Sequence, residues 1–198
     1  MRPLPFSGDL IHSAVYWAAC ALWIGPEVIA SVVKRSKTSS RPQDRGSLGL
    51  IKLLWAIGIA AAVAIAIWLP QTAIMRQRVG FFWAGIGLML IGTAFRWYSA
   101  HVLGKFFTFD VAILSGHALI EAGPYRYIRH PSYTGALVTL VGIGLALGNW
   151  AALVAAVSCL SIAYVYRIRV EEAALVAGLG DSYTQYRRRT WRLVPFLF

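Results

Sequence analysis

Five apolar stretches divide the chain, and polar or turn-forming residues separate them. They cover 10–33, 48–69, 79–103, 132–147 and 150–166. A helix needs about 20 predominantly apolar residues to cross a bilayer, so these stretches predict transmembrane helices. The fourth stretch is short, which predicts either a small tilt or a start below the bilayer surface.

The last two stretches are predicted to form a hairpin. Only Gly148 and Asn149 separate them, and a turn this tight joins antiparallel helices. The composition agrees with a membrane location, because 58% of the residues are hydrophobic, 14% are charged and the mean hydropathy is +0.61. The predicted fold class is an all-α integral membrane protein, with about five transmembrane helices in a single domain over 1–198.

Positive charge is concentrated on one side of this topology. The chain has 19 Lys and Arg against 8 Asp and Glu, a net charge of +11. Fifteen of these cations fall in 34–52, 105–129 and 167–192, which share one side of the membrane. The positive-inside rule therefore predicts an N-terminus outside and a C-terminus in the cytoplasm. Topology and attraction to anionic lipid explain this charge, so no nucleic-acid partner is predicted.

Cys20, Cys159, Glu27 and Arg96 lie within the predicted spans and carry reactive or ionisable side chains. Cys20 and Cys159 lie in the middle of spans and are interpreted as small apolar residues without metal-ligand spacing, so no metal site is predicted. Glu27 and Arg96 are ionisable, and such groups are costly in a membrane and usually paired. The sequence leaves three interpretations of Glu27 and Arg96 open. They form a structural ion pair, they extend their charged groups to the membrane surface, or they take part in the chemistry.

A polar segment, GPYRYIRHPSYTG at 123–135, joins the third and fourth stretches. Its His130-Pro131 step is typical of a helix start, because proline suits the first helical position. Taken singly, its tyrosines and arginines are also typical of a membrane interface. Further along, Arg167 and Glu171 are spaced i, i+4 and so share one side of a helix. Together these groups predict a cytoplasmic face suited to a zwitterionic ligand.

The chain from 117 to 195 resembles a known family. It is similar to the isoprenylcysteine carboxyl methyltransferase family and its prokaryotic relatives. The similarity lies in four successive parts: GPYRYIRHPSYTG, about 30 apolar residues, RIRVEEAALVAGLGDSYTQY and a terminal RLVP. This resemblance implies a membrane methyltransferase that binds S-adenosylmethionine in a cytosolic pocket and receives a lipophilic acceptor from the bilayer. It divides the chain into transmembrane helices over 1–104 and a catalytic part over 105–198. That part comprises a cofactor-binding loop, the hairpin 132–166 and a cytoplasmic tail with a helix whose acidic first turn holds Glu171 and Glu172.

The resemblance also implies roles for individual residues. The cofactor-binding positions are His117, Leu119, Gly123, Tyr125, His130, Tyr133, Glu171 and Glu172. Arg129 or Arg167 is expected to neutralise and orient the acceptor, since a guanidinium binds a carboxylate bidentately. An acceptor carboxylate is already anionic at neutral pH, so the enzyme needs to position it and requires no general base.

Other functions stay open at this point. The implied acceptor is the carboxylate of an isoprenylcysteine-type or other isoprenoid substrate, and the alternatives are a phospholipid amine or a thiol, which require a base or a lowered pKa. Membrane sterol-type reductases that use NADPH are similar in their C-terminal halves, but they tend to show Asn-Tyr where this chain has Ser132-Tyr133. A small helical scaffold would use Gly144 and Gly148 for close packing. It would leave the charged pairs of the tail unexplained.

Overall fold

The computed structural model describes residues 9–33, 46–74, 76–109, 111, 113, 116 and 118–195, and these residues are almost entirely helical. The helices are α1 (Leu10–Val33), α2 (Ser47–Trp68), α3 (Arg78–Leu103), α4 (Pro131–Ala146), α5 (Trp150–Leu179) and α6 (Asp181–Arg189). Short 3₁₀ turns occupy Pro70–Thr72, Gly104–Phe106 and Gly123–Arg126. The predicted all-α class is confirmed.

Four of the described helices are long and apolar enough to cross a membrane. The candidate spans are Leu10–Ser31, Ser47–Trp68, Arg78–Phe106 and Trp150–Leu179. Helix α4 is apolar but has only 16 residues, in agreement with the short fourth stretch of the sequence. The protein is therefore an integral membrane protein, and its described residues include four candidate spanning helices and one shorter apolar helix.

Helix α5 is longer than the sequence predicted. It continues past 166 to Leu179 and ends at Gly180, whose φ is 59°. Glu171 and Glu172 therefore lie inside α5, and the acidic first turn belongs instead to α6, which begins at Asp181. The prediction of a helix start at the two glutamates is wrong, because glutamate is also compatible with a helix interior and the apolar helix continues through the pair.

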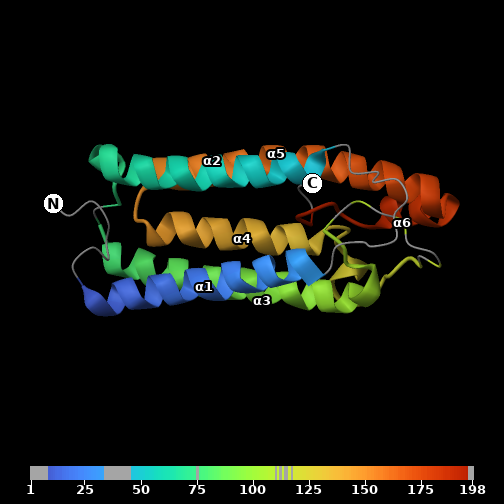
Figure 1. The fold of residues 1–198 in the computed structure, drawn as a ribbon, viewed down its shortest axis with the longest axis horizontal. Helices are drawn as coiled ribbons and strands as arrows, with labels where there is room; N and C mark the ends of the chain where they lie inside the picture. Colours follow the sequence, from blue (N-terminus) through green and yellow to red (C-terminus); the bar gives the residue numbers. More distant parts are fainter. Residues whose placement is uncertain are drawn as a thin grey trace.

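The helices pack lengthwise in three layers (Figure 1). Helices α2 and α5 form one layer, α4 lies in the middle, and α1 and α3 form the third. Glycines bring α3 and α4 into close contact: a Cβ on Gly92 would lie 2.6 Å from Gly135 O, and one on Gly142 would lie 2.6 Å from Gly85 O. This contact fixes α4, and with it the start of the polar segment, against α3.

We expect Gly92→Ala to destabilise the bundle by about 1–3 kcal/mol, since its methyl group would overlap the backbone of α4. Gly87→Ala on the same helix is the matched control, because a Cβ there meets nothing within 4 Å and alanine favours a helix. Thermal unfolding in detergent measures both variants. Equal midpoints for the two would contradict the close packing of α3 on α4.

The hairpin between α4 and α5 is confirmed. Gly148 has a φ of 65°, and the Asn149 side chain accepts a hydrogen bond of 3.0 Å from Ala152 N, which caps α5. Gly144 packs against Leu153 of α5, where an added Cβ would lie 2.6 Å from the backbone. Helix α4 therefore runs away from the end of the bundle that holds α6, called here the polar end, and α5 returns to it.

At the polar end, the chain after α6 pairs with the loop before α4. Arg129 N donates to Trp191 O at 2.7 Å, and His130 N donates to Arg192 O at 3.0 Å. The Thr134 hydroxyl donates to Leu193 O at 2.6 Å, which extends this pairing into α4. The C-terminal segment thus holds the start of α4 in place.

Candidate active site

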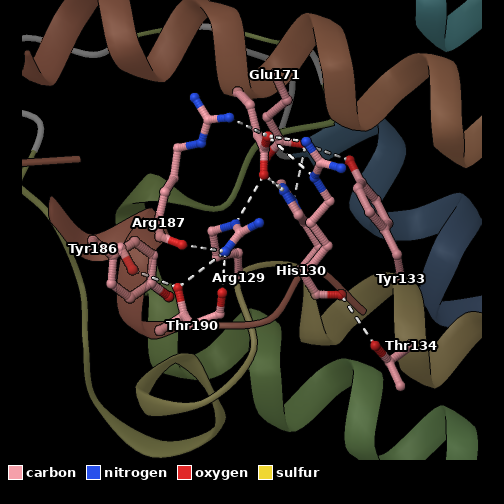
Figure 2. Close-up of polar contacts among 10 residues, drawn as sticks. Arg129, His130, Tyr133, Thr134, Glu171, Tyr186, Arg187 and Thr190 are labelled. Carbon is pink, nitrogen blue, oxygen red and sulfur yellow. Dashed lines mark hydrogen bonds and ion pairs between the residues drawn. The ribbon is translucent and has the colours of Figure 1, made fainter. Parts of the chain in front are cut away.

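His130 lies at the start of α4 and faces two carboxylates of α5 (Figure 2). It occupies the N-cap position before Pro131, and its side chain is buried. His130 Nδ1 lies 3.8 Å from Glu171 Oε2, and Nε2 lies 3.5 Å from Glu172 Oε1. Nε2 makes no hydrogen bond within the described part of the chain, and its nearest ionisable partner is the Glu172 carboxylate behind the ring.

The Glu172 carboxylate lies behind His130 and contacts three arginine side chains. Its carboxylate is buried, with Arg129 Nε at 2.9 Å, Arg192 Nη2 at 3.3 Å and Arg187 Nη2 at 3.7 Å. Arg129 Nη1 also donates to the carbonyls of Arg187, at 3.0 Å, and Thr190. Glu172 and Arg129 therefore join α5 to the loop before α4 and to the end of α6.

Tyr133 connects Glu171 to Arg167. The Tyr133 hydroxyl donates to Glu171 Oε2 at 2.7 Å and accepts from Arg167 Nε at 3.3 Å. Its ring stacks on His130, at 5.6 Å between centroids, and on Tyr164, at 4.5 Å. These five residues form one wall, which we call the α4–α5 wall.

The Arg167 guanidinium is held from three directions. Besides its contact with Tyr133, it donates through Nη1 to Ser47 Oγ at 2.7 Å and through Nη2 to Phe109 O at 2.6 Å. These partners come from α2, α4 and the segment after α3. A cation held in this way can present its charge to a ligand without reorganising.

One cavity of about 350 Å³ connects the polar end to the interior of the bundle. At the polar end it is lined by Leu119, Tyr125, His130, Glu171 and Tyr183. Between the helices it is lined by Trp23, Ile24, Ile51, Trp55 and Leu160, and the Glu27 and Arg96 pair also faces it. The cavity thus combines a polar compartment with an apolar one.

Two buried tyrosines supply neutral donors around the polar compartment. Burial raises the pKa of Tyr125 and of Tyr183 above the ordinary phenol value, so both keep their protons. The Tyr183 hydroxyl is buried without a hydrogen-bond partner in the described part of the chain. Tyr183 was not predicted as a site residue, because its place at the cavity depends on α6 packing against α5.

Seven of the predicted site residues line this one cavity or its wall. They are Leu119, Tyr125, Arg129, His130, Tyr133, Arg167 and Glu171. Glu172 lies behind His130, and Gly123 has a φ of 56° at the 3₁₀ turn beside Tyr98. His117 lies outside the described residues. The sequence left the place of Glu27 and Arg96 open, and it missed Phe109 and Ser47, which are joined to Arg167 only by the fold.

The fold and the cavity define an integral membrane protein with a charged pocket at one end of a helical bundle. Residues 85–177 match the model of the isoprenylcysteine carboxyl methyltransferase family. The resemblance that the motifs predicted is therefore confirmed. The match covers α4, most of α3 and most of α5, including the α4–α5 wall.

Curated relatives agree with this family. The chain is 33% identical over 116 residues to the protein-S-isoprenylcysteine O-methyltransferase of Schizosaccharomyces pombe, covering 58% of this chain and 49% of that protein. It is 32% identical over 117 residues to a probable protein-S-isoprenylcysteine O-methyltransferase of Oryza sativa subsp. indica, covering 58% of this chain and 61% of that protein. In these matches the chain spans between about half and three fifths of its relatives' length.

A solved structure shares the fold over almost the whole chain. It is that of the eukaryotic intramembrane Ras methyltransferase isoprenylcysteine carboxyl methyltransferase, with a TM-score of 0.67 and 20% sequence identity. The match covers 98% of this chain and 72% of that one. At this identity the likeness establishes the arrangement of the helices alone.

Proposed function

We propose that this protein is an integral membrane methyltransferase that transfers a methyl group from S-adenosylmethionine to the carboxylate of an isoprenylcysteine-type acceptor. The observation that carries the proposal is a continuous cavity that joins a charged, aromatic compartment to an apolar one. A charged cofactor and a lipophilic acceptor need these two environments side by side.

The polar compartment suits the cofactor. S-adenosylmethionine has an ammonium, a carboxylate and a sulfonium, which are matched by an acidic side chain, an imidazole or cationic donor and aromatic faces. Glu171 is the more exposed carboxylate of the pair and would take the ammonium or the ribose hydroxyls. His130 would hold the cofactor's carboxylate, and Tyr125 and Tyr133 would line the adenosine and the sulfonium.

The loop before α4 would close around the cofactor. Leu119 and Gly123 belong to this loop, as does His117, and they would contribute mostly backbone groups. Glu172 supports this arrangement from behind, since it contacts both His130 and Arg129. Its proposed role in binding is thus to fix the residues that contact the cofactor.

For this reaction, the protein must align the acceptor carboxylate with the methyl group of the cofactor. An oxygen of the acceptor carboxylate forms a bond to the methyl carbon while the bond between that carbon and sulfur breaks. The electron pair of the broken bond remains on sulfur, and the cofactor leaves as S-adenosylhomocysteine. Holding the two groups in line is worth about 7–11 kcal/mol of the barrier. Arg167, fixed on the α4–α5 wall, would neutralise and orient the carboxylate. Arg129 directs its guanidinium toward Glu172 and backbone carbonyls, and so would act on the acceptor through the loop it holds.

The proposed orientation places the polar end in the cytoplasm and the N-terminus outside. Most of the cations gather in segments on the polar side, in accord with the positive-inside rule. The acceptor would enter the apolar compartment from the bilayer.

Titration calorimetry of the purified protein tests the enzyme class. We expect saturable binding of S-adenosylhomocysteine and none of NADPH, followed by transfer of labelled methyl from S-adenosylmethionine to N-acetyl-S-farnesylcysteine. Saturable binding of NADPH alone would favour the reductase alternative. Methyl transfer only to an amine or a thiol would support the proposed cofactor and contradict the proposed acceptor. His130 would then be the candidate base.

Tyr133→Phe should weaken S-adenosylhomocysteine binding about tenfold, because it removes a hydroxyl bonded to the charged groups of Glu171 and Arg167 while it keeps the stacked ring. Tyr127→Phe is the matched control, since Tyr127 is 61% exposed. Calorimetry measures both affinities. An unchanged affinity in Tyr133→Phe would exclude its hydroxyl from the organisation of the cofactor site.

A further inference from the structure

Glu27 of α1 and Arg96 of α3 form an ion pair at the cavity. Arg96 Nε donates to Glu27 Oε1, and Nη2 donates to Glu27 Oε2 at 2.8 Å, so the guanidinium holds both carboxylate oxygens. The Arg96 side chain is 10% exposed and that of Glu27 is 22% exposed. Arg96 is thus the more enclosed member, and Glu27 is the one closer to open space.

Arg96 is fixed to the same wall as the proposed active site. Its Nη1 donates to Ser132 O at 3.2 Å and to Ser132 Oγ at 3.1 Å. The next residue, Tyr133, contacts Arg167 and Glu171. The guanidiniums of Arg96 and Arg167 therefore contact consecutive residues in the first turn of α4.

Glu27 presents the same chemical group as the proposed acceptor. The guanidinium fork of Arg96 is matched to one carboxylate in a bidentate contact. While Glu27 occupies Nε and Nη2, a second carboxylate cannot take the same two donors. An acceptor carboxylate that approaches the first turn of α4 must therefore compete with Glu27.

Helix α1 has a feature that allows Glu27 to withdraw. Pro26 lies inside α1 directly before Glu27 and cannot donate a backbone hydrogen bond to the carbonyl of Leu22. The adjacent Gly25 has no atom within 4 Å of its Cβ position, so the packing there is open. Arg96, in contrast, is on α3, which glycines hold closely against α4. Bending of α1 would move Glu27 and leave Arg96 in place.

We propose, on the basis of the proposed function, that Glu27 determines acceptor specificity: it is an internal carboxylate that occupies Arg96 until the acceptor carboxylate, which Arg167 also orients, replaces it. A molecule without a free carboxylate does not displace Glu27 and is bound by its apolar chain alone. Methylation turns the acceptor into a neutral ester, which loses its hold on Arg96. The return of Glu27 to Arg96 then favours release of the product.

Steady-state kinetics of Glu27→Gln in the full-length protein test this role. With N-acetyl-S-farnesylcysteine as acceptor, we expect the KM of the variant to be about tenfold lower than that of the wild type, since the competing charge is gone. The methyl ester of the same compound is the matched ligand, and its inhibition constant should change less than about threefold, because it has no charge to pair. Asp9→Asn is the matched variant: Asp9 pairs with His12 at the far end of the same helix, so it should leave both constants unchanged.

The outcomes separate the two proposals. If the wild type methylates the acceptor but Glu27→Gln has an unchanged or higher KM, the role of Glu27 is overturned and the proposed function stands. If neither protein methylates the acceptor, both are overturned. If Glu27→Gln does not fold, Glu27→Asp is used, because its shorter side chain weakens the two-point contact and keeps the charge. A lower KM in Glu27→Asp supports the proposal, and a higher KM or a second failure to fold shows that the pair is structural and overturns it.

Discussion

Glu171→Gln is expected to weaken S-adenosylhomocysteine binding about hundredfold and to leave the thermal unfolding midpoint nearly unchanged. Glu171 is 30% exposed, lines the cavity and contacts the Tyr133 hydroxyl. Glutamine keeps the size of the side chain and removes the charge that the cofactor's ammonium would pair with. Loss of such a charged partner in a largely desolvated site costs about 2–5 kcal/mol of binding.

The neighbouring Glu172→Gln should show the opposite pattern and is the control for Glu171→Gln. Its carboxylate is 5% exposed and offsets the charge of Arg129, which is itself buried. Removing one member of a buried ion pair typically costs about 3–5 kcal/mol of stability, so the unfolding midpoint should fall by several degrees. Calorimetry and thermal unfolding on both variants separate the roles. Equal loss of affinity with equal stability in the two would contradict the distinction between a cofactor contact and a supporting residue.

The helices were predictable because their signal is local. Length and apolar composition mark each span, and the Gly148-Asn149 turn marks the hairpin. The His130-Pro131 step likewise predicts the start of α4, which the structure confirms. These features depend on residues that are adjacent in the chain, and so a single sequence contains them.

The end of α5 was not predictable in the same way. An acidic pair inside a helix is locally unremarkable, and the sequence favoured a helix start there. In the structure Glu172 is offset by Arg129, Arg187 and Arg192, which come from three other places in the chain. Glutamate is tolerated both in the first turn and in the interior of a helix, so the pair alone does not mark where the helix begins.

Arg167 and Arg96 show the same limit within the candidate site. The family resemblance selects Arg167, but its fixed orientation depends on Ser47 and Phe109, which no motif connects to it. The sequence shows Glu27 and Arg96 only as two costly charges within predicted spans. In the structure, Glu27 of α1 and Arg96 of α3 form an ion pair, and this pair lines the cavity.

Arg167→Lys is expected to lower turnover about 100-fold to 1,000-fold, the range found when a preorganised donor to a reacting group is removed. Lysine keeps the positive charge, but its ammonium has no planar fork and cannot reach the Tyr133 hydroxyl, Ser47 Oγ and Phe109 O together. The charge would then no longer be held at the first turn of α4.

The affinity for S-adenosylhomocysteine should change less than about threefold in this variant, because the remaining contacts of Tyr133 and Glu171 are retained. Arg188→Lys on the exposed face of α6 is the matched control and should keep full turnover. Turnover at saturating acceptor, measured beside calorimetric affinity, separates the two effects. A parallel fall in both would place Arg167 among the residues that hold the cofactor, and an unchanged turnover would show that its charge alone, without the fork, is sufficient to orient the acceptor.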